Sequence, residues 1–148
     1  MARSRMQMQK EAELLDAVCF SLKRCKELSK EHKSRLANTF GKRFENALKA
    51  VEEGTVKRYL FKPSGRVVWI VVGKEKDYQV IPTANYCSCD DFYFRVVDND
   101  TSLCYHVIAQ KLSEALERYE AVEDSDNLYE TLMGEWRFIK QEWFTDER

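Results

Sequence analysis

The sequence predicts an α+β fold: N-terminal helices, a three-stranded antiparallel meander, and a cysteine-rich loop that leads into C-terminal helices. Three observations support this prediction. Up to residue 53, apolar residues recur every three or four positions, which is the period of an amphipathic helix. Residues 55 to 81 are rich in β-branched and aromatic residues separated by turn residues, as in short strands. Helical spacing returns after residue 103.

The length of 148 residues fits one domain with a single core. No apolar run reaches the roughly 18 residues that span a membrane, and no hydrophobic signal segment follows the first five residues. We therefore expect no membrane association and a reducing compartment, cytosol or nucleus. The five cysteines are then predicted to be metal ligands or core thiols rather than disulfides, with Cys19 and Cys25 as small buried side chains.

Residues 1–53 are predicted to form an N-terminal helical region. A first helix runs from about Glu11 to Ser29, and a second runs from about His32 to Glu53. Gly54 lies just past the second helix, where a glycine commonly ends one. His32 is predicted to be a surface or capping residue between the two helices.

Three strands are predicted over Thr55 to Phe61, Arg66 to Val72 and Tyr78 to Ile81. The turn Lys62-Pro63-Ser64-Gly65 joins the first two, because Pro presets one turn dihedral and Gly permits a positive one. Residues 67–72 are apolar on both faces, which predicts the central strand, covered on one side by helices.

Two tight pairs of soft ligands follow the meander. Cys87-Ser88-Cys89 is separated by 14 residues from Cys104-Tyr105-His106. Three thiolates and one imidazole close a zinc tetrahedron and leave no position for water, so the pattern predicts one structural Zn²⁺ ion. An iron–sulfur cluster with Cys and His ligands, or buried thiols beside a surface histidine, are the alternatives.

The second ligand pair is predicted to lie at a helix start. Asp100, Thr101 and Ser102 are candidate N-caps, which would place Cys104 and His106 in the first helical turn. The helix dipole would there lower the pKa of the thiol. The helix is predicted to continue to Tyr119 and to end at the polar segment 123–127.

A final helix from about Leu128 to Trp143 is predicted to be a partner-docking arm. Its apolar stripe is rich in tryptophan, as protein interfaces are, and ordinary core packing is the alternative. The candidate partner-binding residues are Leu132, Trp136, Ile139 and Trp143.

Charge is distributed unevenly although the net charge is −1. Residues 1–66 hold 16 Lys and Arg against 8 Asp and Glu, and residues 67–148 hold 8 against 17. The basic half is where DNA would be contacted, and the acidic surroundings of the metal loop suit a protein partner better. The alternative is that the basic and acidic residues lie on solvated helix faces that complement each other. The candidate DNA contacts are Lys23, Arg24, Lys26, Lys42 and Arg43.

The Cys-x-Cys and Cys-x-His pairs resemble the SWIM zinc finger. Ala109, three residues after His106, matches the extended pattern of the SWIM subunits of Shu complexes. Phe40-Gly41, the turn at residues 62–66, and Phe92 and Phe94 behind the finger extend the resemblance to roughly residues 35–135. Asp90 and Tyr105 depart from it, because the family commonly has Pro and Lys there. Residues 54–122 are accordingly predicted to be the finger domain and residues 123–148 the C-terminal helix.

The resemblance implies a non-enzymatic, nuclear factor of homologous-recombination DNA repair. Members of this family pair with a paralogue of the RecA-like recombinase and promote recombinase filament assembly on single-stranded DNA, which this chain would reach through the complex. An enzyme is not expected, because four protein ligands leave no open position on the metal. The alternative is a SWIM zinc-finger adaptor in another nuclear protein–protein or DNA-binding complex.

Overall fold

The computed structural model describes residues 5–73, 76–89 and 103–146, with side chains for residues 9–73, 76–89 and 103–136. The helices are α1 (Arg5–Cys25), α2 (Lys30–Phe40), α3 (Lys42–Glu52), α5 (Tyr105–Leu116) and α6 (Asp126–Asp146), with a short 3-10 helix η1 (Pro82–Ala84). The strands are β1 (Val56–Lys62), β2 (Arg66–Val72), β3 (Asp77–Ile81), β4 (Tyr86–Cys87) and β5 (Glu120–Ser125). The α+β class is confirmed.

The strands form one mixed sheet in the order β4-β3-β2-β1-β5. The predicted meander β1-β2-β3 is confirmed, and so is the central place of β2. Two strands lie outside the prediction: β4, which pairs with β3, and β5, which runs parallel to β1. The predicted polar break at 123–127 does lie between two helices, but residues 123–125 belong to β5 and α6 begins at Asp126. Local spacing does not predict this strand, because its hydrogen bonds come from the distant strand β1.

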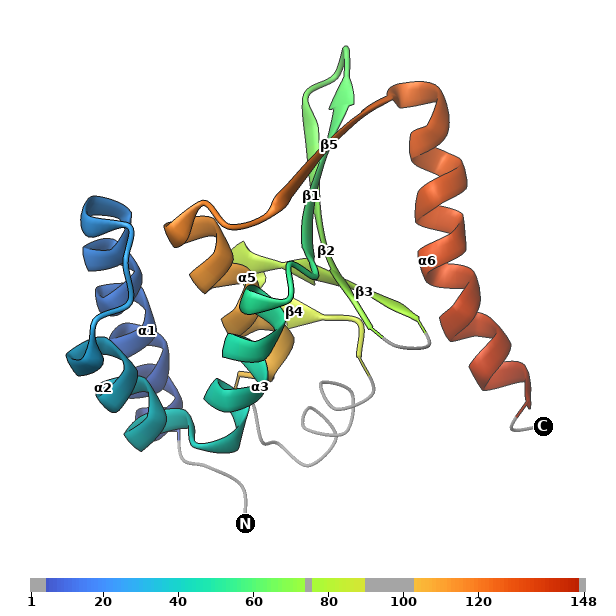
Figure 1. Ribbon diagram of the computed structural model, residues 1–148. Coiled ribbons are helices and arrows are strands. Elements are labelled where there is room, and N and C mark those ends of the chain that lie inside the picture. Colours follow the sequence, from blue (N-terminus) through green and yellow to red (C-terminus); the bar gives the residue numbers. More distant parts are fainter. Residues whose placement is uncertain (1–4, 74–75, 90–102, 147–148) are drawn as a thin grey trace.

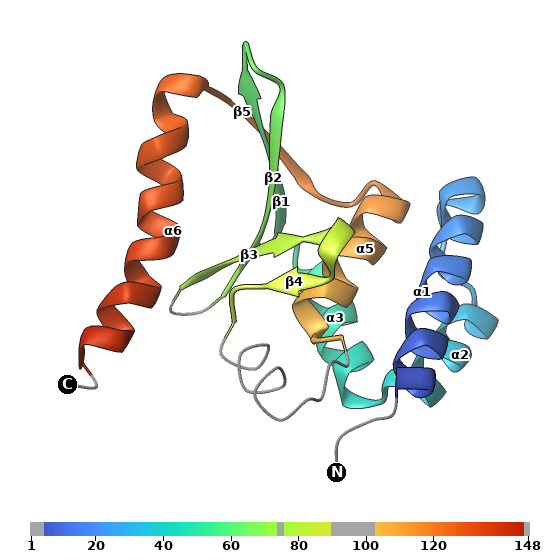
Figure 2. The ribbon, with the colours of Figure 1, turned by 180° about the vertical axis from the view of Figure 1, so that it is seen from behind.

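Both faces of the sheet are covered. Helices α1, α2, α3 and α5 lie on one side, and α6 lies by itself on the other (Figures 1 and 2). Along β2, Trp69 and Val71 join the larger apolar cluster under the four helices. Val68 and Ile70 join a smaller cluster under α6. The helices predicted on one side are present, and α6 also covers the second face, which the sequence did not predict.

The predicted second helix is broken at Gly41. This residue has φ 55° and ψ −124°, a backbone conformation that side chains with a Cβ rarely adopt. Its N–H closes α2 by donating to the carbonyl of Ala37. At the other end of α2, Ser29 is the N-cap, and Ser29 and His32 exchange hydrogen bonds with each other's backbone N–H. The capping role predicted for His32 is confirmed.

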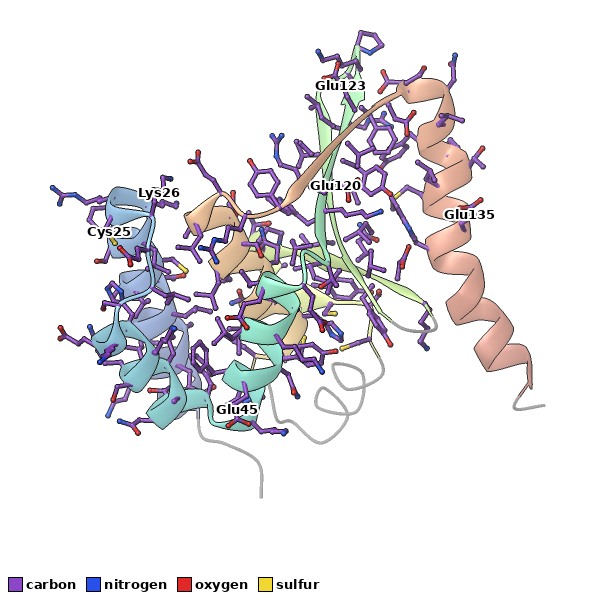
Figure 3. All side chains as sticks on the ribbon, in the orientation of Figure 1. Cys25, Lys26, Glu45, Glu120, Glu123 and Glu135 are labelled. Carbon is purple, nitrogen blue, oxygen red and sulfur yellow. The ribbon has the colours of Figure 1, made fainter. Side chains whose placement is uncertain are left out.

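The two cysteines of α1 differ from each other. Cys19 is buried, with its thiol near the carbonyl of Lys111. Cys25 is exposed at the last residue of the helix (Figure 3), so its predicted burial was wrong. None of the helices in the described part of the chain combines the length and the apolar character needed to cross a membrane.

Candidate metal centre

The four predicted metal ligands come together in the structure. Cys87 ends β4, Cys89 follows two residues later, Cys104 is the N-cap of α5, and His106 lies in the first turn of α5. All four are buried, and their ligand atoms lie within 4.8 Å of one another. The site therefore joins the edge of the sheet to the N-terminal end of a helix.

Ser88 explains how two neighbouring cysteines face the same point. Its backbone N–H donates to the carbonyl of Gln79 at 3.0 Å, and its hydroxyl accepts from the N–H of Gln79 at 2.9 Å. These bonds anchor Ser88 to β3 beyond the last residue of β4. The chain bends after β4, and the sulfurs of Cys87 and Cys89 both reach the cluster.

The donor set fits zinc. Ligand atoms around a tetrahedral zinc ion lie about 3.6–3.8 Å apart, so small side-chain rotations would close the observed site. Among the described residues, neither ring nitrogen of His106 has a hydrogen-bond partner although the side chain is buried. A buried polar nitrogen without a partner is costly, and coordination of a metal would relieve that cost. Cys87, Cys89, Cys104 and His106 would hold the ion.

The imidazole of His106 lies between two tyrosine rings, Tyr78 at 4.3 Å and Tyr105 at 4.0 Å between centroids. Tyr105 is the residue that replaces the Lys common in the resembling family. Burial raises the pKa of Tyr105, and negative charge on the three neighbouring cysteines raises it further. The uncharged ring of Tyr105 thus packs against one side of the site.

The three thiols of the cluster interact with one another. Hydrogen bonds from Cys87 and then Cys89 lower the pKa of Cys104 to about 3, with help from the backbone N–H groups of Val107 and His106. Hydrogen bonds of Cys87 with Cys104 and with Cys89, together with burial, raise the pKa of Cys87. The backbone N–H groups at the start of α5 thus favour the charged form of Cys104, in line with the effect expected at a helix N-terminus.

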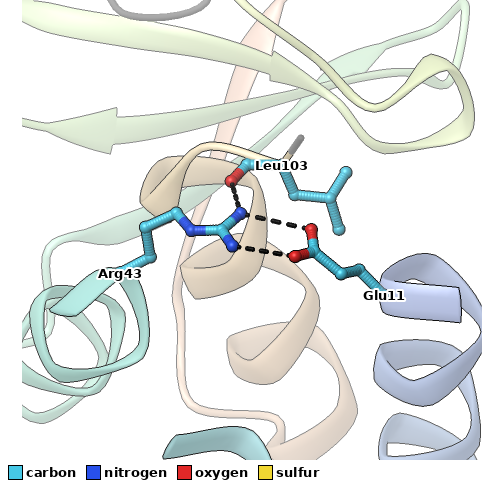
Figure 4. A network of polar contacts seen from close by, with 3 residues as sticks. All are labelled: Glu11, Arg43 and Leu103. Atoms are coloured by element: carbon cyan, nitrogen blue, oxygen red, sulfur yellow. Dashed lines mark hydrogen bonds and ion pairs between the residues drawn. The ribbon is translucent and has the colours of Figure 1, made fainter. Parts of the chain in front are cut away.

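A buried ion pair touches the segment that leads into Cys104. Arg43 of α3 donates to the carboxylate of Glu11 of α1, with Nη2 3.0 Å from Oε2 and Nη1 3.4 Å from Oε1 (Figure 4). The same Nη1 donates to the carbonyl of Leu103 at 2.7 Å. Side-chain exposure is 5% for Glu11 and 13% for Arg43. The guanidinium is thus engaged inside the fold, unlike the surface position that a DNA contact requires.

The sequence does contain a signal for this pair. Glu11 lies four residues before Leu15 and seven before Val18, on the apolar stripe of α1. A carboxylate at a buried position requires a cation, and the helical region that follows supplies several. The spacing does not identify which one, so the choice of Arg43 comes only from the structure.

The other predicted site residues have different surroundings. Ala109 is fully buried in α5, and Phe92 and Phe94 lie outside the described residues, as do the predicted caps at 100–102. Lys26 pairs with Glu117, Lys42 pairs with Glu45, and Lys23 and Arg24 are exposed on α1. Trp136 is buried against Tyr59, and Leu132 is half-buried in the same cluster. Ile139 and Trp143 belong to α6, but their side chains lie outside the description.

Comparison with known proteins gives one consistent family. No protein-family model matches the chain, and no solved structure matches it. The mouse zinc finger SWIM domain-containing protein 7 is 33% identical over 131 residues, which cover 86% of each chain. The human protein of that name is 30% identical over 116 residues, covering 77% of this chain and 82% of the relative.

A more distant relative carries the same name. The zinc finger SWIM domain-containing protein 7 homolog of Dictyostelium discoideum is 27% identical over 116 residues, 77% of this chain and 74% of the relative. The matches thus extend over most of the chain, within which the structure gathers three cysteines and a histidine into one buried cluster. The chain belongs to the zinc finger SWIM domain-containing protein 7 family.

Proposed function

We propose that this chain is a non-enzymatic subunit of a Shu-type complex, which pairs with a recombinase paralogue and promotes recombinase filament assembly in homologous-recombination DNA repair in the nucleus. The observation that carries the proposal is the buried cluster of three cysteines and one histidine, in a chain of this family. Ala109, buried three residues after His106, adds support because it matches the pattern of Shu-complex SWIM subunits.

The metal has a structural role in this proposal. Four protein donors fill a tetrahedral zinc ion, so it offers no open position for a substrate or for water. Bound zinc would supply cohesion between β4 and the first turn of α5. Structural zinc ions bind with an apparent free energy of about 10–16 kcal/mol, which exceeds the net stability of many whole domains.

The partner-binding role of α6 depends on how it is held. Trp136 and Leu132 pack against Tyr59 and neighbouring residues of the sheet. They would therefore hold α6 in place against the sheet. Ile139 and Trp143 follow farther along the same helix. We propose that the C-terminal part of α6, held by Trp136, contributes to the contact with the recombinase paralogue.

A pull-down with zinc quantification tests the proposal. Wild-type protein and Cys25→Ser, which changes an exposed cysteine outside the cluster, are expected to bind one zinc ion and to retain a recombinase paralogue. Cys104→Ser and His106→Ala are expected to lose the zinc and the paralogue together, because each removes a buried ligand.

Two outcomes would contradict the proposal in different ways. Full zinc stoichiometry in Cys104→Ser would refute the assignment of the metal site. A wild-type protein that binds zinc but retains no recombinase paralogue would refute the Shu-type role and favour the alternative of a SWIM adaptor in another nuclear complex.

A further inference from the structure

We infer that Glu11 and Arg43 are positioning residues for the metal centre, through which the first helix of the chain controls the geometry and the zinc affinity of the cluster. The inference rests on the zinc site of the proposed function and goes beyond it. It gives the N-terminal helix a role at the metal, although that helix contributes no ligand.

The contacts form a continuous path from α1 to the ligand. The carboxylate of Glu11 accepts from both terminal nitrogens of Arg43, a two-bond arrangement that fixes the plane of the guanidinium. Nη1 of the same group is 2.7 Å from the carbonyl oxygen of Leu103. That carbonyl belongs to the peptide bond whose nitrogen is the N of Cys104. The guanidinium therefore holds the peptide plane that precedes the ligand.

Cys104 is sensitive to this peptide plane for two reasons. It is the N-cap of α5, where the chain enters the helix with φ −79° and ψ 163°. It is also one of the four ligands, whose ligand atoms lie within 4.8 Å of one another. A rotation of the peptide plane at this point moves the sulfur relative to the other three ligands. Leu103 itself is buried, so the segment is held by its side chain as well as by its carbonyl.

Another contact with α5 lies far from the metal. The comparison distinguishes a positioning role of Arg43 at the metal from general stabilisation of the helix packing. Lys26, the residue after the end of α1, also contacts the C-terminal end of α5, through Glu117 at 3.2 Å and the carbonyl of Ala115 at 3.4 Å. Those contacts lie at the C-terminal end of α5, about 18 Å along the helix from its metal end. Arg43 instead donates to the carbonyl next to a ligand. Partners just outside the ligands of a metal commonly change its affinity by about 10–100-fold when they are lost.

The deciding variant removes both members of the pair. Glu11→Met with Arg43→Met removes both charges of the pair together, and apolar replacement of a buried ion pair is commonly tolerated by a fold. It does remove the hydrogen bond to Leu103. We expect circular dichroism of the zinc-free protein to stay close to wild type, and zinc affinity, measured by competition with a chromophoric chelator, to fall about 10–100-fold.

Substitution of cobalt(II) for zinc gives an absorption spectrum that would not change if Glu11 and Arg43 only stabilised the fold. The energies of its visible absorption bands report the arrangement of the thiolates around the ion, and we expect them to shift in the double variant. Lys26→Met is the matched control, because it removes a contact between the residue after α1 and the far end of α5. It should keep both the wild-type zinc affinity and the wild-type cobalt spectrum.

A folded double variant with zinc affinity within twofold of wild type and an unchanged cobalt spectrum overturns the inference. If the double variant does not fold, Arg43→Lys decides, since one ammonium group cannot serve Glu11 and Leu103 as the guanidinium does. A several-fold loss of affinity in that variant supports the positioning role, and wild-type affinity overturns it. Failure of wild-type protein to bind zinc would instead refute the proposed metal site.

Discussion

The positive charge of Arg43 is neutralised inside the fold, whereas Lys23 and Arg24 keep theirs at the surface. The three residues look alike in the sequence, where each is a basic residue of a helical segment in the basic half. Burial separates them, because a cation that enters a core must bring a carboxylate with it. The number of basic residues in the N-terminal half therefore gives only an upper limit on the positive charge available to DNA.

Cys19 shows what burial does to a thiol outside the metal site. Burial raises its pKa from 9.0 to about 12. In the unfolded chain the thiol ionises near pH 9, whereas in the folded protein it stays neutral. The group therefore stabilises the folded state below pH 9, and that contribution is lost as the pH rises from 9 toward 12.

This pKa shift predicts a pH-dependent difference between wild type and Cys19→Ala. Between pH 8 and pH 10, wild-type protein should lose about 1.4 kcal/mol of unfolding free energy relative to the variant. The measurement is urea unfolding at both pH values. The contributions of all other titrating groups are the same in both proteins and cancel in the difference. Parallel pH profiles of the unfolding free energy would therefore contradict the prediction.

The elements that the sequence predicts well are those held by local spacing. The amphipathic helices and the meander follow from periods of 3.6 and 2, and the zinc ligands from the rarity of cysteine and histidine. Strand β5 cannot be predicted in this way, because it is acidic and its residues are at most half-buried. Its pairing partner also lies about sixty residues earlier, as in Lys57 opposite Glu120. The link from Arg43 to Leu103 is equally nonlocal.

The helix break at Gly41 is an element-scale feature that can be tested. Gly41→Ala should lower the unfolding free energy by about 1–3 kcal/mol, because a Cβ is strained at φ 55° although no atom lies near it. Gly134→Ala in α6 is the matched control. No atom lies within 4 Å of its added Cβ either, so the helix should gain about 0.5–1 kcal/mol.

Urea unfolding of the two zinc-loaded variants makes the comparison. Effects of opposite sign are expected. A neutral or stabilising Gly41→Ala would mean that α2 and α3 can join into the one continuous helix that the sequence alone predicts.

At the scale of the whole molecule, the sheet separates two unequal parts. Four helices and the metal centre lie on one face, and α6 lies on the other with a small cluster around Phe61, Ile70 and Trp136 (Figure 1). The exposed basic residues Lys23 and Arg24 belong to the helix-rich part. Any direct DNA contact is therefore expected on the side of the sheet away from α6.

Salt dependence tests this expectation. Binding of single-stranded DNA to the isolated protein should weaken with salt, and Lys23→Gln with Arg24→Gln should reduce the slope of log K against log salt by about 1.4. Lys62→Gln, on β1 and paired with Glu123, is the control and should leave the slope unchanged. No binding at low salt would exclude a direct contact and leave the DNA to the other members of the complex.

The acidic strand β5 also explains why the sheet stops at five strands. In the described part of the chain, no strand pairs with its outer edge. Glu120 and Glu123 lie along it (Figure 3), and although Lys57 and Lys62 pair with them, the strand itself carries no basic residue. Two copies that met edge to edge would bring carboxylates against carboxylates. The acidic side chains of β5 therefore disfavour pairing of this edge with the same edge of a second copy.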